Sequence, residues 1–132
     1  MGHDKEWEMS EKITGRCLCG ATTYSVNGPG KFGIVCFCSD CQRAAGTGHA
    51  PQLGVERASL TVDGPIKSFT QKADSGSDLD FRFCADCGSP LIKTTSRAPE
   101  IAFLYAGSLG DPEVFRDPKL VFEGSRQIWD RA

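Results

Sequence analysis

The segment Cys36-Phe37-Cys38-Ser39-Asp40-Cys41 contains three of the seven cysteines in a sequence of 132 residues. The other four form one pair on each side of it, Cys17-Leu18-Cys19 and Cys84-Ala85-Asp86-Cys87. Closely spaced thiolates in a loop or hairpin converge on one point, which suits a soft tetrahedral ion such as zinc at about 2.3 Å per sulfur. The clustering of the cysteines therefore predicts metal binding.

Disulfide bonds and buried free cysteines both fit this pattern less well than metal binding does. A disulfide framework conflicts with the odd number of cysteines, and a bridge between residues i and i+2 holds the sulfurs in a poor geometry. Buried free cysteines can act as small hydrophobic residues, but this role does not account for the position of every cysteine in a close-spaced cluster. Metal binding is the interpretation that accounts for the clusters.

Seven ligands do not divide into two complete tetrahedral sites. The simplest partition joins the two pairs into a closed site of four thiolates, which we expect to be structural. Its ligands are Cys17, Cys19, Cys84 and Cys87. The triplet Cys36, Cys38 and Cys41 then provides three ligands and leaves one position open, the arrangement of a catalytic zinc. The sequence thus predicts two zinc ions per chain, one structural and one catalytic.

A fourth protein ligand would close the three-cysteine site. The candidates are His49, eight residues after Cys41, and His3 near the N-terminus. A lone histidine between glycine and alanine is more often an ordinary surface or core residue than a ligand, so we expect the position to stay open. Arg43 is the cation nearest to Cys41 in the sequence and could balance the thiolate charge, although a solvated surface charge is the simpler interpretation.

Composition indicates one water-soluble globular domain. The chain is 39% hydrophobic and 24% charged with a formal net charge of −2, so neither a disordered chain nor a nucleic-acid-binding protein is expected. The longest apolar run, Ile101–Ala106, is far short of the roughly 20 residues that a membrane helix needs. Residues 1–12 are acidic without an apolar stretch, so no secretory signal is expected. We predict a cytoplasmic protein with a flexible N-terminal lead-in, residues 1–12, and a single zinc-binding domain, residues 13–132.

The expected fold class is mainly β, because short runs rich in β-branched and aromatic residues lie between frequent turn residues. The expected strands are 21–26, 33–37, 59–62, 66–71, 79–83, 91–95, 101–106 and 120–122. Thr61–Lys67 is expected to form a hairpin about the turn Asp63-Gly64-Pro65. The best helical candidate is Ser39–Ala45, where Ser39 or Asp40 could supply the N-cap.

Strings of residues around the cysteines form a recognisable pattern that runs from Gly15 to Trp129. They are Gly15-Arg16-Cys17-Leu18-Cys19-Gly20 with Tyr24, Cys36-Phe37-Cys38-Ser39-Asp40-Cys41-Gln42-Arg43 with Gly46, Ser75-Gly76, Arg82-Phe83-Cys84-Ala85-Asp86-Cys87-Gly88-Ser89, and Ala106-Gly107-Ser108-Leu109. The pattern resembles the glutathione-dependent formaldehyde-activating enzyme family, which includes vertebrate centromere protein V. Three cysteine clusters in this order are a specific signal, unlike an isolated C-x-x-C. This chain departs from many members at Phe37, where they have a histidine, and at Gly110-Asp111, where they have an acidic pair.

The resemblance implies an Mss4-like fold, in which small antiparallel β-sheets are organised around zinc. It also implies an activity, the joining of glutathione to formaldehyde to give S-(hydroxymethyl)glutathione, which is classed in the reverse direction as a carbon–sulfur lyase reaction. In that scheme Cys36, Cys38 and Cys41 hold the catalytic zinc, and the other four cysteines hold the structural one.

Two functional hypotheses follow. The first is a zinc-dependent carbon–sulfur lyase that joins or cleaves a small thiol, with glutathione as first candidate, and an aldehyde at the open zinc position. The second is a non-catalytic, zinc-organised binding module, which would have complete metal sites and a large exposed apolar face. The uneven number of cysteines favours the enzyme. The expected partner is a small thiol substrate, with no nucleic acid and no membrane, and the oligomeric state is left open.

Overall fold

The computed structural model describes residues 12–131, which form two β-sheets, one α-helix and several short 3-10 helices. The small sheet has the strand order β1-β2-β5, and the large sheet has the order β10-β3-β4-β9-β8-β7-β6. The elements are β1 (Ile13–Arg16), β2 (Thr23–Val26), β3 (Phe32–Cys36), α2 (Ser39–Ala45), β4 (Ala50–Glu56), η1 (Arg57–Ser59), β5 (Leu60–Asp63), β6 (Ile66–Lys72), β7 (Asp78–Cys84), β8 (Pro90–Thr95), β9 (Ile101–Tyr105), η2 (Ala106–Ser108), η3 (Pro112–Val114), β10 (Lys119–Val121) and η4 (Glu123–Ser125).

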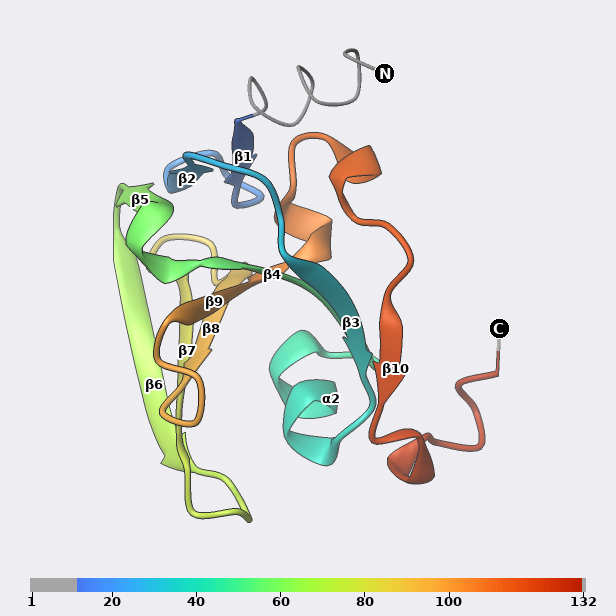
Figure 1. Ribbon diagram of the computed structural model, residues 1–132. Coiled ribbons are helices and arrows are strands. Elements are labelled where there is room, and N and C mark those ends of the chain that lie inside the picture. Colours follow the sequence, from blue (N-terminus) through green and yellow to red (C-terminus); the bar gives the residue numbers. More distant parts are fainter. Residues whose placement is uncertain (1–11, 132) are drawn as a thin grey trace, which may run out of the picture.

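The predicted fold class is confirmed: the chain is mainly β, with small sheets and cysteine clusters that could hold zinc, as in an Mss4-like fold. The paired strands of residues 12–131 are antiparallel, except that β10 runs parallel to β3. The large sheet curves around α2, so that β6 and β7 lie on one side of the helix and β3 and β10 on the other (Figure 1).

The two faces of the large sheet carry different residues. On β4, Leu53 and Val55 point to one face and pack with Ile13 of the small sheet in the main apolar core. Gln52 points to the other face, where it lies opposite Tyr105 of β9 in the strand register. This second face is the one that meets α2, and it carries a smaller cluster built from Cys36, Cys41, Ala50 and Tyr105.

The expected strands are present within one or two residues at each end, but two further strands were not expected from the sequence. One is β1, and the other is β4, which contains Pro51 and Gly54 and is buried on both faces. Such a strand shows no apolar–polar alternation, and proline and glycine argue against a strand in the sequence. The helix spans the predicted range, Ser39–Ala45, but its N-cap is Cys38 rather than Ser39 or Asp40, because the Cys38 Sγ accepts the hydrogen bond from Cys41 N–H.

The predicted hairpin over Thr61–Lys67 is wrong. Strand β5 pairs with β2 in the small sheet, whereas β6 pairs with β7 in the large sheet. Gly64 turns the chain with a φ of +112°, and Pro65 has no N–H to donate across the turn. The Thr22 hydroxyl instead donates a hydrogen bond of 2.6 Å to the Pro65 carbonyl. The chain therefore passes from one sheet to the other at this turn.

The predicted lead-in, residues 1–12, lies outside the described residues except for Lys12, so it stays a prediction. Within residues 12–131, no helix has the length and apolar character needed to cross a membrane.

Replacement of Gly64 by alanine is expected to lower the free energy of unfolding by about 2 kcal/mol or more. The positive φ is strained for alanine, and the new Cβ would overlap the backbone carbonyl oxygen of Ala21. Gly124→Ala is a matched control, because a Cβ there meets no atom of the described chain within 4 Å. Urea denaturation of both variants provides the measurement, and equal midpoints would contradict the role given to Gly64.

Candidate metal centres

The first cysteine cluster joins the start of the domain to the turn between β7 and β8, about 65 residues later. Cys17 and Cys19 lie in the loop between β1 and β2, while Cys84 ends β7 and Cys87 lies in the turn before β8. Their four sulfurs all lie within 4.8 Å of one another. The Cys17–Cys19 and Cys19–Cys84 sulfur distances are 3.6 and 3.8 Å. Four thiolates at about 2.3 Å from a tetrahedral metal would be about 3.8 Å apart, so this donor set fits such an ion.

Backbone amides and one hydroxyl surround these sulfurs with donors. Thr22 N–H points at the Cys17 Sγ at 3.3 Å, and Cys87 N–H points at the Cys84 Sγ at 3.4 Å. Ser89 connects the two pairs, since its Oγ accepts from Leu18 N–H at 2.9 Å and lies 3.1 Å from the Cys87 Sγ. The Ser89 hydroxyl lowers the pKa of Cys87 to about 5. Donors of this kind favour thiolates, the form of cysteine that binds metals.

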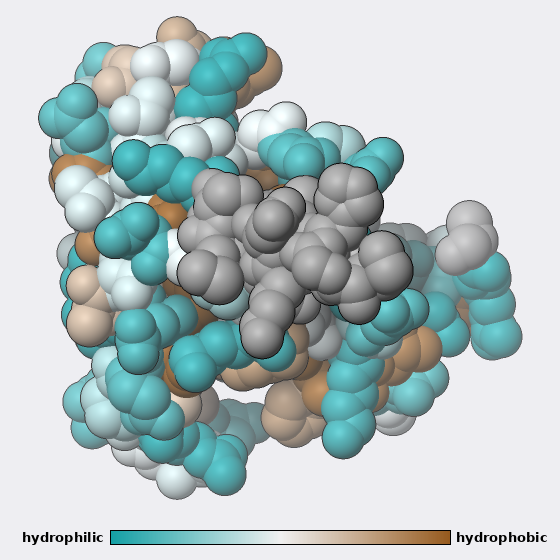
Figure 2. All heavy atoms as spheres, turned by 45° about the horizontal axis from the view of Figure 1, so that its top comes forward, coloured by the Kyte–Doolittle hydropathy of each residue, from teal (hydrophilic) through white to brown (hydrophobic). Residues whose placement is uncertain are grey.

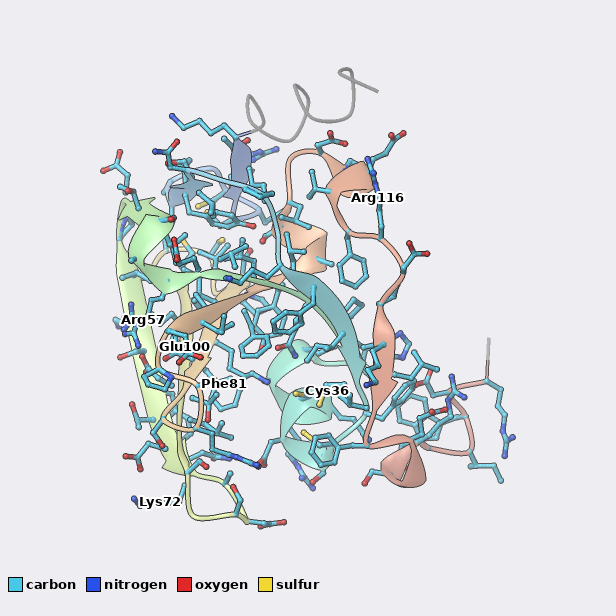
Figure 3. The ribbon with its side chains drawn as sticks, viewed as in Figure 1. Cys36, Arg57, Lys72, Phe81, Glu100 and Arg116 are labelled. Carbon is cyan, nitrogen blue, oxygen red and sulfur yellow. The ribbon has the colours of Figure 1, made fainter. Side chains whose placement is uncertain are left out.

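The second cluster forms where β3 runs into α2. Cys36 ends the strand, Cys38 caps the helix, and Cys41 lies in the first turn of the helix. Their sulfurs also lie within 4.8 Å of one another, and they are visible beside the label of Cys36 in Figure 3. Cys36 and Cys41 are buried, whereas Cys38 is half-buried. The structure thus brings together each of the two predicted sets, one of four sulfurs and one of three.

A buried cation lies beside the three-cysteine cluster. Lys93 of β8 is 9% exposed, and its Nζ lies 3.7 Å from the Cys41 Sγ and 4.9 Å from the centre of the Phe103 ring. Gln52 donates from Nε2 to the same sulfur at 3.4 Å. The Arg43 side chain, by contrast, is exposed. Lys93 was not expected, because 52 residues separate it from Cys41 and only the sheet register brings β8 and β4 to the same site.

Hydrogen bonds among the three thiols divide their protons unequally. The pKa of Cys38 is lowered, first because the Cys36 thiol donates to its sulfur and next because the Cys41 thiol does. The hydrogen bonds of Cys36 with Cys38 and with Cys41 raise the pKa of Cys36. The positive charge of Lys93 also lowers the pKa of Cys38. Without a metal, the cluster therefore already favours one thiolate, held at the half-buried position.

Histidine does not complete this cluster within the described chain. The cluster contains cysteines alone, and His49 instead lies 2.7 Å from Asp130, between Nδ1 and Oδ2. The other candidate, His3, lies outside residues 12–131.

Two clefts adjoin the three-cysteine cluster and share Pro90 and Tyr105. The larger cleft has a volume of about 610 Å³ and extends from Cys17 and Arg16 to His49. The smaller cleft, of about 390 Å³, lies between α2 and strands β6 and β7. The three sulfurs themselves do not line either cleft, but Tyr105 packs against them and lines both.

Tyr105 presents an unpaired donor at this position. Its side chain is buried, and its hydroxyl has no hydrogen-bond partner within residues 12–131. Burial, followed by negative charge at the three-cysteine cluster, raises its pKa, so the hydroxyl stays protonated at neutral pH. A buried hydroxyl without a partner is costly unless a ligand or water satisfies it.

The family model of the glutathione-dependent formaldehyde-activating enzyme matches residues 12–125. This chain belongs to that family. A Halomonas elongata protein named "Putative glutathione-dependent formaldehyde-activating enzyme" is 30% identical over 114 residues, which are 83% of this chain and 72% of that protein. A crystal structure of a Rhodobacter sphaeroides protein resembles the fold with a TM-score of 0.60 at 18% identity, covering 82% of this chain and 99% of that one.

Residues that carried the resemblance to the formaldehyde-activating enzyme family meet in the structure. Gly15 has room for no Cβ, because the Tyr24 ring lies against it. The Tyr24 hydroxyl is 2.6 Å from the Ser108 Oγ, which in turn donates to the Tyr105 carbonyl at 2.7 Å. These contacts tie the small sheet to η2 and so to the end of β9, where Tyr105 faces the three cysteines.

A second set of contacts holds the C-terminal segment, residues 122–131, against the three-cysteine cluster. Gln42 of α2 donates from Nε2 to the carbonyls of Phe37 at 2.7 Å and Ser125 at 3.0 Å. Its Oε1 accepts from Gln127 Nε2 at 2.9 Å. The Arg126 guanidinium lies over the Phe37 ring at 4.5 Å from its centre. Gln42 thus bonds both to Phe37, between the first two cysteines of the cluster, and to the C-terminal segment. We call its three hydrogen bonds the Gln42 latch.

Replacement of Gln42 by alanine is expected to cost about 2–3 kcal/mol of stability, since it leaves two carbonyls without their donor. Gln127→Ala removes only one of these bonds, so its cost is expected to be about 1 kcal/mol or less. Urea denaturation measures the stability, and amide hydrogen exchange measures opening of residues 122–131. Exchange in that segment that is equally slow in the Gln42→Ala and native proteins would argue against the Gln42 latch.

Proposed function

We propose that the chain binds two zinc ions, one at each cysteine cluster, and that it joins a small thiol to an aldehyde at the three-cysteine site. Glutathione is the first candidate for the thiol and formaldehyde for the aldehyde, as the family name and the relative's name suggest. In the reverse direction the reaction is that of a carbon–sulfur lyase. The observation that carries the proposal is the pairing of a closed four-sulfur cluster with a three-sulfur cluster beside a cleft.

The three-cysteine cluster suits a site that exchanges one ligand. Three thiolates leave the fourth position of a tetrahedral ion free, and soft sulfur ligands favour a further sulfur there. Zinc at this position would supply a Lewis acid that holds a thiol as its thiolate.

Residues of the chain offset the negative charge that such a site collects. Three thiolates and one zinc ion carry a formal charge of −1, and a bound thiolate makes it −2. The Lys93 ammonium and the Gln52 amide lie against Cys41 and oppose this charge in a buried setting. Tyr105 keeps its proton and can donate to the ligand or to the aldehyde oxygen.

The clefts fit a small peptide-like thiol. Binding sites for small molecules commonly have volumes of about 300–1,000 Å³, the range in which both clefts fall. Arg16 lines the larger cleft, and the exposed Arg43 lines the smaller one together with Arg82, which pairs with Asp80. Arg43 is the first candidate to bind a carboxylate of glutathione. We expect the protein to work in a reducing compartment such as the cytoplasm, because metal binding needs reduced cysteines.

A non-catalytic binding module is the alternative hypothesis. It predicts a large exposed apolar face. On the face shown in Figure 2, outside the grey residues, hydrophobic residues form small areas separated by hydrophilic ones. The uneven number of cysteines favours the enzyme, which is the hypothesis that we put to the test.

The two clusters are expected to differ in what they stabilise. Cys84→Ser should remove one metal ion per chain and destabilise the fold by several kcal/mol, because the binding free energy of a structural zinc, roughly 10 kcal/mol or more, is folding free energy. Cys38→Ser should also remove about one metal ion but shift the thermal transition by only a few degrees, as for a typical loss of about 1 kcal/mol. Metal analysis and thermal melts of protein purified without chelator make the comparison. Equal destabilisation by the two variants would refute the division into a structural and a catalytic site.

Cobalt substitution tests thiol binding at the three-cysteine site. A fourth thiolate changes the ligand field of tetrahedral Co(II), so glutathione should alter the absorption of the cobalt protein. The apparent affinity should rise with pH up to the pKa of the free thiol, because binding releases the thiol proton. Cys38→Ser is the control and should abolish the change. If glutathione, cysteine and a dithiol all leave the spectrum unchanged, the enzyme hypothesis fails and the binding module is favoured.

A further inference from the structure

His49 and Asp130 form an isolated pair at the edge of the larger cleft. The His49 Nδ1 lies 2.7 Å from the Asp130 Oδ2, and their side chains are 32% and 11% exposed. A carboxylate at this distance accepts the proton of Nδ1, which leaves the lone pair on Nε2. His49 lines the larger cleft together with Tyr105. The pair therefore offers a proton acceptor beside the cleft.

The ring of His49 also packs against the segment of chain that carries the three cysteines. Its centre is 5.3 Å from that of the buried Phe37 ring, and Phe37 separates Cys36 from Cys38 in the sequence. In addition, Ala50, the residue after His49, pairs with Cys36 in the ladder between β3 and β4. The sheet register thus places Ala50 against the three-cysteine cluster and fixes the backbone of His49, the residue directly before it.

Contacts with the surrounding chain hold Asp130 beside His49. Gly48 leaves the space that the carboxylate occupies, since a Cβ at this position would overlap Asp130. Asp130 N–H donates to the Gln127 carbonyl at 3.0 Å, and Gln127 is bonded to Gln42 of α2. The Gln42 latch therefore also positions Asp130. Contacts from the helix, from the residue before His49 and from the C-terminal segment converge on the hydrogen-bonded pair of His49 and Asp130.

We propose that His49, oriented by Asp130, is the catalytic residue that moves the proton during thiol–aldehyde addition. This inference rests on the proposed function. His49 Nε2 takes up the proton that the thiol gives up on binding, and the sulfur electron pair then forms the bond to the carbonyl carbon. The π electrons of the carbonyl move to its oxygen, which takes the proton back from His49. The reverse sequence cleaves the adduct, and no other reactant is consumed.

Asp130 is a positioning residue in this scheme. Its carboxylate accepts from Nδ1 and so keeps Nε2 free of its proton in the neutral ring. An asparagine of the same shape can donate its amide hydrogen to Nδ1, which stabilises the tautomer with the proton on Nε2 and removes the acceptor. A purely structural role for Asp130 would not depend on the tautomer.

The test uses His49→Gln and Asp130→Asn in the zinc-loaded protein, with Asp78→Asn as control. Asp78 lies in an exposed ion pair with Lys72 on the strands away from the larger cleft, so that variant should behave as the native protein. The rate of adduct formation, measured by loss of free thiol, should fall by about 100- to 10,000-fold in kcat for His49→Gln, the usual effect of losing a general acid–base group. KM and the thiol affinity of the cobalt protein should change by less than about threefold. Long-range ¹H–¹⁵N spectra should show the Nδ1–H tautomer of His49 in the native protein and the Nε2–H tautomer in Asp130→Asn.

The outcomes separate this inference from the proposed function. A native protein that binds thiols but does not accelerate addition overturns the proposed function, and the catalytic role of His49 falls with it. An active native protein whose kcat is unchanged in His49→Gln overturns the role of His49 alone. An Nε2–H tautomer in the native protein also overturns that role, and this readout does not depend on activity.

Discussion

The convergence of Cys17 and Cys19 with Cys84 and Cys87 constrains the whole chain. It brings the loop between β1 and β2 of the small sheet against the turn between β7 and β8 of the large sheet. The chain passes between these sheets at Gly64, whose turn packs against the same loop through Thr22. The two sheets already share an apolar core, and four ligands on one ion would add binding free energy to the stability of the fold.

The large sheet then divides the domain into an apolar side and a chemical side. Leu53 and Val55 of β4 face the core shared with the small sheet, while Gln52 faces α2. Lys93 reaches the same side from β8 and Tyr105 from β9. Buried polar groups are costly unless they have partners. Here Gln52 and Lys93 both contact the sulfur of Cys41.

The C-terminal segment completes the surroundings of the three-cysteine cluster. Gln42 and Arg126 hold this segment over Phe37, and the segment places Asp130 beside His49. Where many members of the family have a histidine, this chain has Phe37, and the imidazole packed against that phenylalanine comes from His49 instead.

The sequence by itself determined the cysteine clusters, the family, the mainly β class and the limits of α2, because each of these is a local spacing or an alternation along the chain. It did not reveal that β5 and β6 belong to different sheets, nor that the proline-containing β4 lies inside the large one. The sequence also did not predict which side chains surround the cysteines or pair with one another, namely Lys93, Gln52, Tyr105 and the pair of His49 and Asp130. Their partners lie up to about 80 residues away, and only strand register and the docking of the C-terminal segment bring them together. Such contacts depend on tertiary packing, which leaves no periodic trace in the sequence.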